Sequence, residues 1–257
     1  DIRVLKESGV FSFFAAEYEK NDINENDAAR LIAGFVKSEN TSTKKPFTGR
    51  CNIYSDYDGV VLINESSINS INYVDESITI ATLLPYALVQ KGQMIATIKI
   101  IPFATSKSSV KKCIEICKNN FPVIKVAPLK NYNIGLLLTS FKNEDNNILN
   151  KTIKVIKSRI ESLGSKIKIQ LTCNHDELSI SKGIKNLLEN KCSPILINGA
   201  SAIVDNNDVI PLAIRMAGGF IIHYGMPVDP GNLLLIGKYQ QTYIIGLPGC
   251  AKSPRLN

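Results

Sequence analysis

Residues 134–171, IGLLLTSFKNEDNNILNKTIKVIKSRIESLGSKIKIQL, hold two apolar runs on either side of a helical pattern. Ile134–Thr139 and Ile167–Leu171 have the length and composition of buried strands. A helix is predicted between them, over about residues 150–163, because large apolar residues recur at helical spacing and Gly164 follows. Its predicted buried positions are Ile153, Ile156, Ile160 and Leu163. A strand, a helix and a strand joined by short connections are typical of a parallel sheet covered by helices.

The same alternation continues along the rest of the chain. Helices are predicted over residues 176–189 and 208–217. Strands are predicted over residues 194–197, 220–224, 233–236 and 243–247, the last two as a hairpin-like pair. For residues 131–257 we therefore predict an α/β domain with a parallel-type sheet and helices on both faces. Ligands of such sheets bind at the loops that follow the carboxyl ends of the strands, so functional residues are expected there.

Residues 1–130 have a different character. A helix is predicted over residues 27–37, with Asn26 or Asp27 as its cap, and another over residues 109–119. The polar stretch 38–45 is predicted to be a loop. Between residues 46 and 102, short runs rich in Val, Ile and Thr alternate with Gly and Pro, as in β structure. The expected first domain is an N-terminal helix plus a smaller β-rich module.

Composition narrows the class of protein. The 257 residues are 44% hydrophobic and 21% charged, which argues against a disordered or collagen-like chain. No apolar run approaches the roughly 20 residues that cross a bilayer, so no membrane partner is expected. The net charge of +7 allows an anionic partner, but the cations are spread along the chain with few aromatic residues among them, and nucleic acid is not expected.

The cysteines and histidines do not suggest a metal site. No two of the six cysteines form a Cys-x-x-Cys pair, and with only two histidines a zinc site would lack its usual ligands. Cys113 and Cys117 share one face of a predicted helix, where buried small hydrophobic residues are expected. Cysteine use of this kind favours a reducing compartment, and a cytoplasmic location is expected.

Three loops of the second half carry small, polar or charged residues. The first, NGASAIVDNNDVIP (198–211), has small residues that let backbone amides approach a ligand, and a helix begins near Asp208. Asp208 is interpreted either as a helix cap or as an acid of a site, and both roles can coexist. The second loop is MPVDPGN (226–232), and the third is GLPGCAKSP (246–254).

Taken together, these loops resemble the molybdopterin-binding domain shared by molybdopterin adenylyltransferase and molybdopterin molybdotransferase. The likeness rests on DVIP (208–211), DPGNLL (229–234) and GLPG (246–249) with Lys252-Ser253 behind it. The Asp176-Glu177 pair after the second strand also matches the adenylyltransferase. The likeness covers about residues 133–257.

This resemblance implies a role in molybdenum cofactor biosynthesis, with molybdopterin or the molybdenum cofactor as the ligand. It also implies Mg²⁺ and, for an adenylyltransferase, ATP. Asp176 and Asp208 would then be the catalytic acids and hold the metal between phosphate groups. The ligand-binding residues that it implies are Gly199, Ala200, Ser201, Ala202, Asp229, Pro230, Gly231, Asn232, Pro248, Gly249, Lys252 and Ser253.

A further resemblance covers nearly the whole chain. PFTGR (46–50), KIIPFA (99–104) and GMPVDPGN (225–232) resemble signatures of two-part bacterial proteins in which such a region precedes a cytidylyltransferase-like nucleotidyltransferase domain. This implies a C-terminal nucleotidyltransferase domain as a partner and a second domain cut short at residue 257. Relatives of the molybdopterin-binding domain assemble as dimers or trimers, so the resemblance also implies a homo-oligomer. Arg50 in the first motif is interpreted either as an anion contact or as a solvated or salt-bridged surface residue.

The first loop departs from the catalytic pattern. Where the adenylyltransferase has TGGTG, this chain has NGASA (198–202), so side chains occupy positions where glycine permits close approach of a phosphate. Two functions remain open. One is a transferase that adenylylates molybdopterin or inserts the metal, and the other is a non-catalytic module that binds the pterin and delivers it to a fused nucleotidyltransferase.

Overall fold

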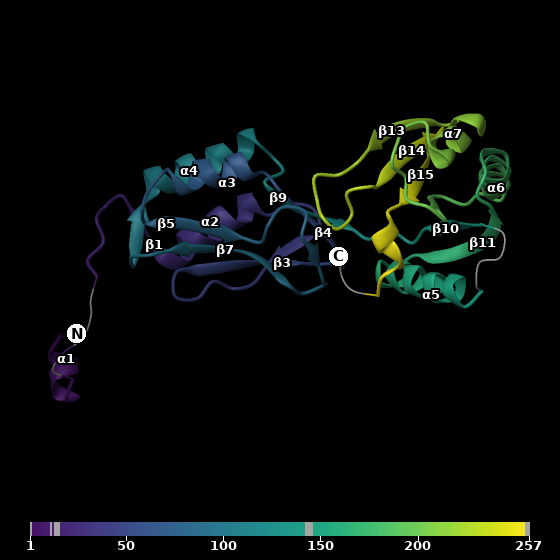
Figure 1. The fold of residues 1–257 in the computed structure, drawn as a ribbon. Coiled ribbons are helices and arrows are strands. Elements are labelled where there is room, and N and C mark those ends of the chain that lie inside the picture. The colour runs from purple at the N-terminus through teal and green to yellow at the C-terminus, as the bar shows by residue number, and fades with distance from the viewer. Residues whose placement is uncertain (1, 11, 13–15, 142–145, 255–257) are drawn as a thin grey trace. The chain divides into compact units, whose positions relative to one another are not determined.

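The computed structural model describes residues 2–10, 12, 16–141 and 146–254 of the chain. Contacts divide it into two compact units, Asp1–Leu129 and Lys130–Asn257 (Figure 1). Each unit has its own hydrophobic core.

The second unit is built on a six-stranded sheet with the order β11-β10-β12-β15-β14-β13. The strands are β10 (Asn133–Ser140), β11 (Lys166–Asn174), β12 (Ile195–Asn198), β13 (Phe220–Tyr224), β14 (Leu235–Tyr239) and β15 (Thr242–Leu247). The first four in spatial order are parallel, whereas β14 runs antiparallel to both of its neighbours. The sheet is therefore mostly parallel, and the predicted pairing of the last two strands in the chain is confirmed.

Helices cover both faces of this sheet, as Figure 1 shows. They are α5 (Asn146–Ser162), α6 (Glu177–Glu189), α7 (Val209–Met216) and the short 3-10 helix η1 (Gly249–Lys252). Side chains of β10 alternate between the two faces, so that Leu137 lies in the core with α6 and α7, whereas Leu136 and Leu138 lie in the core with α5. A strand buried on both faces is apolar throughout, which is why it was visible in the sequence. The predicted α/β class with helices on both faces is confirmed.

The first unit combines antiparallel strands with helices. A four-stranded sheet has the order β2-β3-β7-β5, a three-stranded sheet has the order β6-β4-β9, and β1 pairs with β8. The strands are β1 (Asp22–Asn24), β2 (Thr41–Thr43), β3 (Arg50–Ser55), β4 (Gly59–Ile63), β5 (Ile78–Thr82), β6 (Leu88–Val89), β7 (Met94–Ile100), β8 (Ala104–Ser106) and β9 (Ile124–Pro128). The helices are α1 (Ile2–Glu7), α2 (Glu25–Val36), α3 (Glu65–Asn72) and α4 (Lys107–Asn119).

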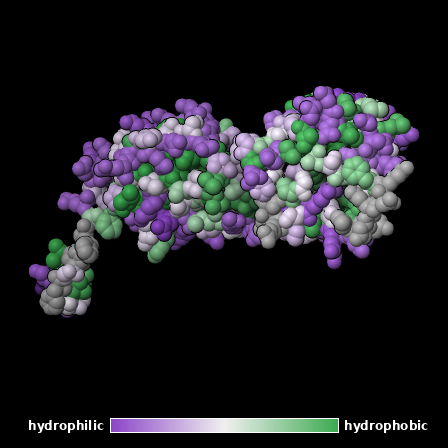
Figure 2. All heavy atoms as spheres, in the orientation of Figure 1, coloured by the Kyte–Doolittle hydropathy of each residue, from purple (hydrophilic) through white to green (hydrophobic). Residues whose placement is uncertain are grey.

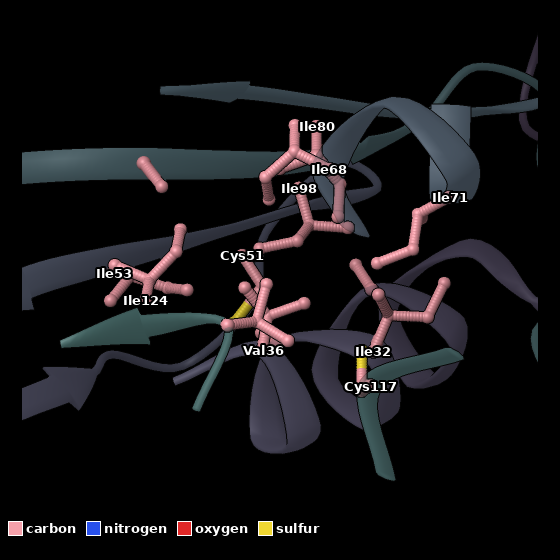
Figure 3. Close-up of a cluster of buried hydrophobic side chains, with 14 of the residues drawn as sticks. Ile32, Val36, Cys51, Ile53, Ile68, Ile71, Ile80, Ile98, Cys117 and Ile124 are labelled. Carbon is pink, nitrogen blue, oxygen red and sulfur yellow. The ribbon is translucent and has the colours of Figure 1, made fainter. Parts of the chain in front are cut away.

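The core of this unit is rich in isoleucine. Side chains from β3, β5, β7 and β9 meet side chains from α2, α3 and α4, as Figure 3 shows for Ile32, Ile98 and their neighbours. Cys113 and Cys117 are buried in the same core, which confirms that they serve as small hydrophobic residues. Burial raises the pKa of Cys113 to about 12 and that of Cys117 to about 11, because desolvation disfavours the thiolate.

The structure corrects several predicted boundaries. Helix α2 begins at Glu25, and Asn24 is its cap in place of Asn26 or Asp27, because pairing of β1 with β8 keeps Asn24 extended. Residues 38–45 are not all loop, since they contain β2. Leu163 is 44% exposed, because α5 ends at Ser162 and Leu163 falls in the turn that follows.

Hydrophilic side chains cover part of the surface of the first unit. On the face seen in Figure 2, hydrophilic residues cover the α4 side of the first unit, where the lysines 107, 111, 112 and 118 are exposed. Within the described part of the chain, none of the helices combines the length and the apolar character that crossing a bilayer requires.

Candidate functional site

The strand registers bring the predicted loops to one edge of the second sheet. Tyr224 pairs with Leu235, Leu235 with Gly246, and Gly246 with Ile197. Since β13 runs in the same direction as β12 and β15, the loops that follow these three strands lie at the same edge. The loop after β11, which contains Asp176, joins them there because β11 is parallel to β10 and β10 to β12. The structure therefore brings together the strand-end loops that carry the predicted site residues.

A hydrogen-bonded network ties three of these strand ends together. The buried Thr139, near the end of β10, accepts a hydrogen bond from the backbone N–H of Ala200 at 2.8 Å. The same hydroxyl lies 2.7 Å from Nδ1 of His175, and Nε2 of His175 lies 2.9 Å from the hydroxyl of Ser201. Phe141 contacts the His175 ring edge-on, with the ring centroids 5.2 Å apart. The imidazole is thus held from two sides and fixes the Ser201 hydroxyl.

The loop after β12 presents donors at this place. No acceptor within the described residues is recorded for the backbone N–H groups of Ser201 and Ala202, and both residues are exposed. Gly199 is required just before them, because a Cβ there would lie 2.6 Å from the carbonyl oxygen of Ser201. The N–H of Ala200 is already used by Thr139, so the donors available to a ligand are those of the next two residues and the Ser201 hydroxyl.

Asp208 holds the far end of this loop. It is the N-cap of α7, with Oδ1 accepting from the N–H of Val209 at 2.8 Å and Oδ2 from the N–H of Val204 at 3.2 Å. The hydroxyl of Tyr224 donates to the carbonyl of Ile203 at 2.8 Å, which fastens the loop to the end of β13. The capping role of Asp208 is therefore observed, and both of its carboxylate oxygens accept backbone hydrogen bonds.

Asp176 also caps a helix. Its Oδ1 accepts from the N–H of Ser179 at 2.7 Å at the start of α6, and this hydrogen bond holds the pKa of Asp176 below its usual range. Across residues 2–10, 12, 16–141 and 146–254, no group of three or more His, Cys, Asp or Glu side chains is placed to hold a metal ion. Asp176 and Asp208 both accept hydrogen bonds from backbone amides, and their assignment as acids of a Mg²⁺ site stays a prediction.

The remaining predicted residues divide between two places. Asp229, Pro230, Gly231 and Asn232 lie on the surface of the loop between β13 and β14, at the strand-end edge. Pro248 and Gly249 follow β15 there and lead into η1. Lys252 and Ser253 lie against α5, where Arg159 donates to the carbonyls of Ala251 and Ser253 at 3.2 and 2.8 Å.

Lys252 lines a basic cavity of about 500 Å³ beside α5. The other residues that line it are Lys151, Lys154, Val155, Ser158, Arg159 and Pro254. None of residues 199–202 lines this cavity, so the structure associates Lys252 with the lysines of α5 instead of with the loop after β12.

Two residues of the network were not predicted from the sequence. Thr139 is the polar residue that ends an otherwise apolar strand, and His175 stands between a strand end and the acidic pair 176–177. A polar residue that ends a buried strand at the carboxyl edge was a usable signal, because ligand-binding side chains gather there. His175 was considered only as a zinc ligand, so its position beside the Asp-Glu pair was missed.

Comparisons with known proteins give weak likenesses only. No protein-family model matches the chain, and a search of curated proteins finds no match. Among solved structures, a molybdopterin biosynthesis MoeA protein from Pyrococcus horikosii is similar over 88% of this chain and 74% of its own, with 13% identity and a TM-score of 0.36. A MogA structure is similar over 48% of this chain and 84% of its own, with 16% identity and a TM-score of 0.32. A nicotinate-nucleotide pyrophosphorylase from Francisella tularensis is similar over 79% of this chain and 92% of its own, with 10% identity and a TM-score of 0.22. Likenesses this low say nothing about the ligand of this chain.

Proposed function

We propose that the second unit binds molybdopterin, or an activated or metallated form of it, by its phosphate group and acts in molybdenum cofactor biosynthesis as a binding module. The observation that carries the proposal is the Thr139–His175–Ser201 network, which fixes one hydroxyl beside two backbone N–H groups that have no acceptor among the residues that the structure describes. Such a group of donors suits an oxyanion. The pterin comes from the resemblance of the loops to the molybdopterin-binding domain.

Each part of the edge has a defined task in this proposal. The N–H groups of Ser201 and Ala202 and the Ser201 hydroxyl donate to phosphate oxygens, as small-residue loops at strand ends do elsewhere. His175 orients that hydroxyl, and Thr139 orients His175. Residues 229–232, of which Gly231 is half-buried and the others are exposed, lie at the same edge. In this proposal they contact the pterin.

The engagement of the two acids favours binding over metal-dependent transfer. Asp176 accepts the N–H of Ser179, and Asp208 accepts those of Val204 and Val209. Recruiting either carboxylate to Mg²⁺ would compete with helix-capping hydrogen bonds, each of which contributes about 1 kcal/mol to stability. A module that holds the phosphate without a metal keeps these caps.

A titration under anaerobic conditions tests the proposal. Purified molybdopterin and its dephosphorylated form are titrated into the wild-type chain, Ser201→Ala and Ser162→Ala, the last being a control at an exposed serine of α5. We expect molybdopterin to bind at least tenfold more weakly to Ser201→Ala than to wild type, with Ser162→Ala unchanged and the dephosphorylated pterin bound weakly by all three. Equal binding of both pterins to the wild type would contradict a phosphate site.

The same preparation distinguishes a binding module from a transferase. Wild-type protein is incubated with molybdopterin, ATP and Mg²⁺, and adenylylated pterin is sought by mass spectrometry. A binding module gives no product beyond the protein-free rate. Accumulation of adenylylated pterin over many turnovers would overturn the non-catalytic proposal in favour of the transferase.

A further inference from the structure

The PFTGR motif of the first unit forms one wall of a small basic cavity that the proposed function does not use. The cavity measures about 180 Å³ and is lined by Lys44, Lys45, Phe47, Thr48, Arg50, Asn52 and Tyr54. Three of these residues are cations, and none is an aspartate or a glutamate. A cavity of this size admits a small anion but not a whole nucleotide or pterin.

The hairpin that forms this wall is fixed in place. Phe47 and Arg50 exchange two backbone hydrogen bonds of 3.0 Å around Thr48 and Gly49, both of which have positive φ. Asn26 accepts the N–H of Gly49 at 3.0 Å, and Lys99 donates to the carbonyl of Thr48. Thr48 is β-branched, and such residues rarely adopt a positive φ. The hydrogen bonds made by Phe47, Gly49 and Thr48 therefore hold the turn in this conformation.

Like charges face each other across the strands beside the cavity. Arg50 pairs directly with Lys99 in the register of β3 and β7, an arrangement that destabilises a sheet unless an anion compensates it. None of Lys44, Lys45, Arg50 and Lys99 takes part in an ion pair with any described residue. Glu25 is an acid beside the turn, on the Lys99 side: a Cβ at Gly49 would lie 3.0 Å from both Glu25 Oε2 and Lys99 Nζ, and Glu25 does not line the cavity.

The floor of the cavity is ordered by polar and aromatic side chains. The ammonium of Lys44 lies 4.5 Å from the centroid of the Tyr54 ring. Asn52 accepts from the Thr97 hydroxyl at 2.7 Å and donates to the Tyr54 hydroxyl at 3.3 Å. The Lys44 ammonium thus lies over a ring whose hydroxyl accepts a hydrogen bond from Asn52, and side chains held by such contacts lose less entropy on binding.

We propose that this cavity is an anion site of the first unit that binds a diphosphate group, either inorganic pyrophosphate or the diphosphate of a nucleotide whose remaining part stays outside the cavity. Three cations without carboxylate partners match a diphosphate, which carries several negative charges, better than a carboxylate, which carries one. The guanidinium of Arg50 offers paired donors to two phosphate oxygens. The site is independent of the proposed pterin site, which lies in the other unit.

Isothermal titration calorimetry on the full chain tests this proposal, with pyrophosphate, ADP and acetate as separate titrants. The variants are Arg50→Gln in the cavity, Lys111→Gln as a control that removes one exposed cation of α4, and Ser201→Ala to identify any binding at the pterin site. We expect pyrophosphate to bind at least tenfold more weakly to Arg50→Gln, with less than a twofold change for Lys111→Gln. The Arg50-dependent component remains in Ser201→Ala, and acetate does not bind.

The titrants also distinguish the two sources of the diphosphate. Tighter binding of ADP than of pyrophosphate assigns the site to a nucleotide, and the reverse order assigns it to the free anion. An equal loss in Arg50→Gln and Lys111→Gln, or no saturable pyrophosphate binding by the wild type, would overturn the proposal. Lysine acetylation footprinting on the wild type needs no variant: pyrophosphate is expected to protect Lys44 and Lys45 but not Lys111, and absence of protection contradicts the site.

Discussion

Replacing Gly199 by alanine is expected to destabilise the second unit and to displace the loop after β12. A Cβ at this position would lie 2.6 Å from the carbonyl oxygen of Ser201 and 2.9 Å from Cδ1 of Ile210. The first of these atoms belongs to the backbone of the same loop and cannot turn away as a side-chain end can. Because ordinary contact between carbon and oxygen begins at about 3.4 Å, the loop must open by roughly 0.8 Å.

This displacement of the loop is expected to lower the free energy of unfolding. Overpacking of a close-fitting site typically costs about 1–3 kcal/mol, and a movement of the Ser201 carbonyl also shifts its hydroxyl from His175. We expect a loss of about 2 kcal/mol in the free energy of unfolding. Gly249 provides a matched control at the same edge, since a Cβ there would meet nothing within 4 Å and its φ is not positive. Gly249→Ala is expected to be neutral or slightly stabilising, by up to about 0.5 kcal/mol, because alanine restricts the unfolded chain.

Urea unfolding followed by circular dichroism measures the difference. With m-values of about 1–3 kcal/mol per M, a loss of 2 kcal/mol lowers the midpoint by roughly 1 M, whereas Gly249→Ala leaves it unchanged or higher. Hydrogen exchange of peptides from β10 and β12 assigns the change to the second unit. Equal midpoints for the two variants would refute the reasoning, because they would show that the loop absorbs the Cβ freely. Molybdopterin binding is expected to fall in Gly199→Ala.

Three further predictions concern single groups. Thr139→Val removes the acceptor of the Ala200 N–H, and a loss of about 1–3 kcal/mol is expected to speed exchange of that amide at least tenfold by NMR, with unchanged exchange contradicting the network. The Ser109 hydroxyl donates to Asp75 at 2.6 Å and holds the pKa of that carboxyl below its usual range, so the contribution is present above about pH 4 and is lost as pH falls through the folded pKa. Ser109→Ala is therefore expected to cost roughly 1 kcal/mol in urea unfolding at pH 7 and less at pH 3, and an equal cost at both values would disprove the coupling. Burial raises the pKa of Cys113 to about 12, so the neutral thiol stabilises the fold below about pH 8.5 and this contribution is lost as pH rises. Iodoacetamide at pH 9 is expected to leave Cys113 unmodified in the folded chain and to alkylate it in urea, as read by mass spectrometry.

The α/β fold of the second unit could be predicted because its signals are local. Leu136, Leu137 and Leu138 are fully buried, and a strand covered on both faces is apolar along its whole length. Helix α5 shows its buried positions at helical spacing in one short segment.

The first unit was harder to predict because its strands are short and pair over long distances. Strand β1 pairs with β8, so that Asp22 lies opposite Ser106, and Gly59 of β4 lies opposite Pro128 of β9. The three residues of β2 contain only threonine and serine, which carry no apolar alternation. Helix α3 buries Ile68 and Ile71 as its only large side chains, too few for a recognisable period. Partners distant in sequence create these elements, and no local pattern marks them.

In the candidate site, too, local features could be predicted and contacts between distant residues could not. The loops could be located from the sequence because each follows a strand, but the hydrogen bonds that give them a chemical role join residues far apart. Thr139 and His175 are separated by 36 positions, and Ala200 and Thr139 by 61. Asp208 could be named as a candidate acid from the sequence. Its hydrogen bonds with two backbone N–H groups depend on the path of residues 204–209, which the sequence does not show. Sequence therefore located the edge but could not decide which acids are available there.

The hydrogen bonds of the NGASA loop (198–202) change how its alanines are interpreted. At Ala200 the backbone N–H is consumed by Thr139, so the loss of glycine there does not remove a donor from the ligand. The donors that remain belong to Ser201 and Ala202, and Asp208 closes the loop by accepting backbone N–H groups. In this loop His175 fixes the Ser201 hydroxyl, and Asp208 and Tyr224 fasten the backbone. Such an arrangement suits holding a phosphate in one pose, and moving either carboxylate toward a metal would break these hydrogen bonds, which is why we propose binding without transfer.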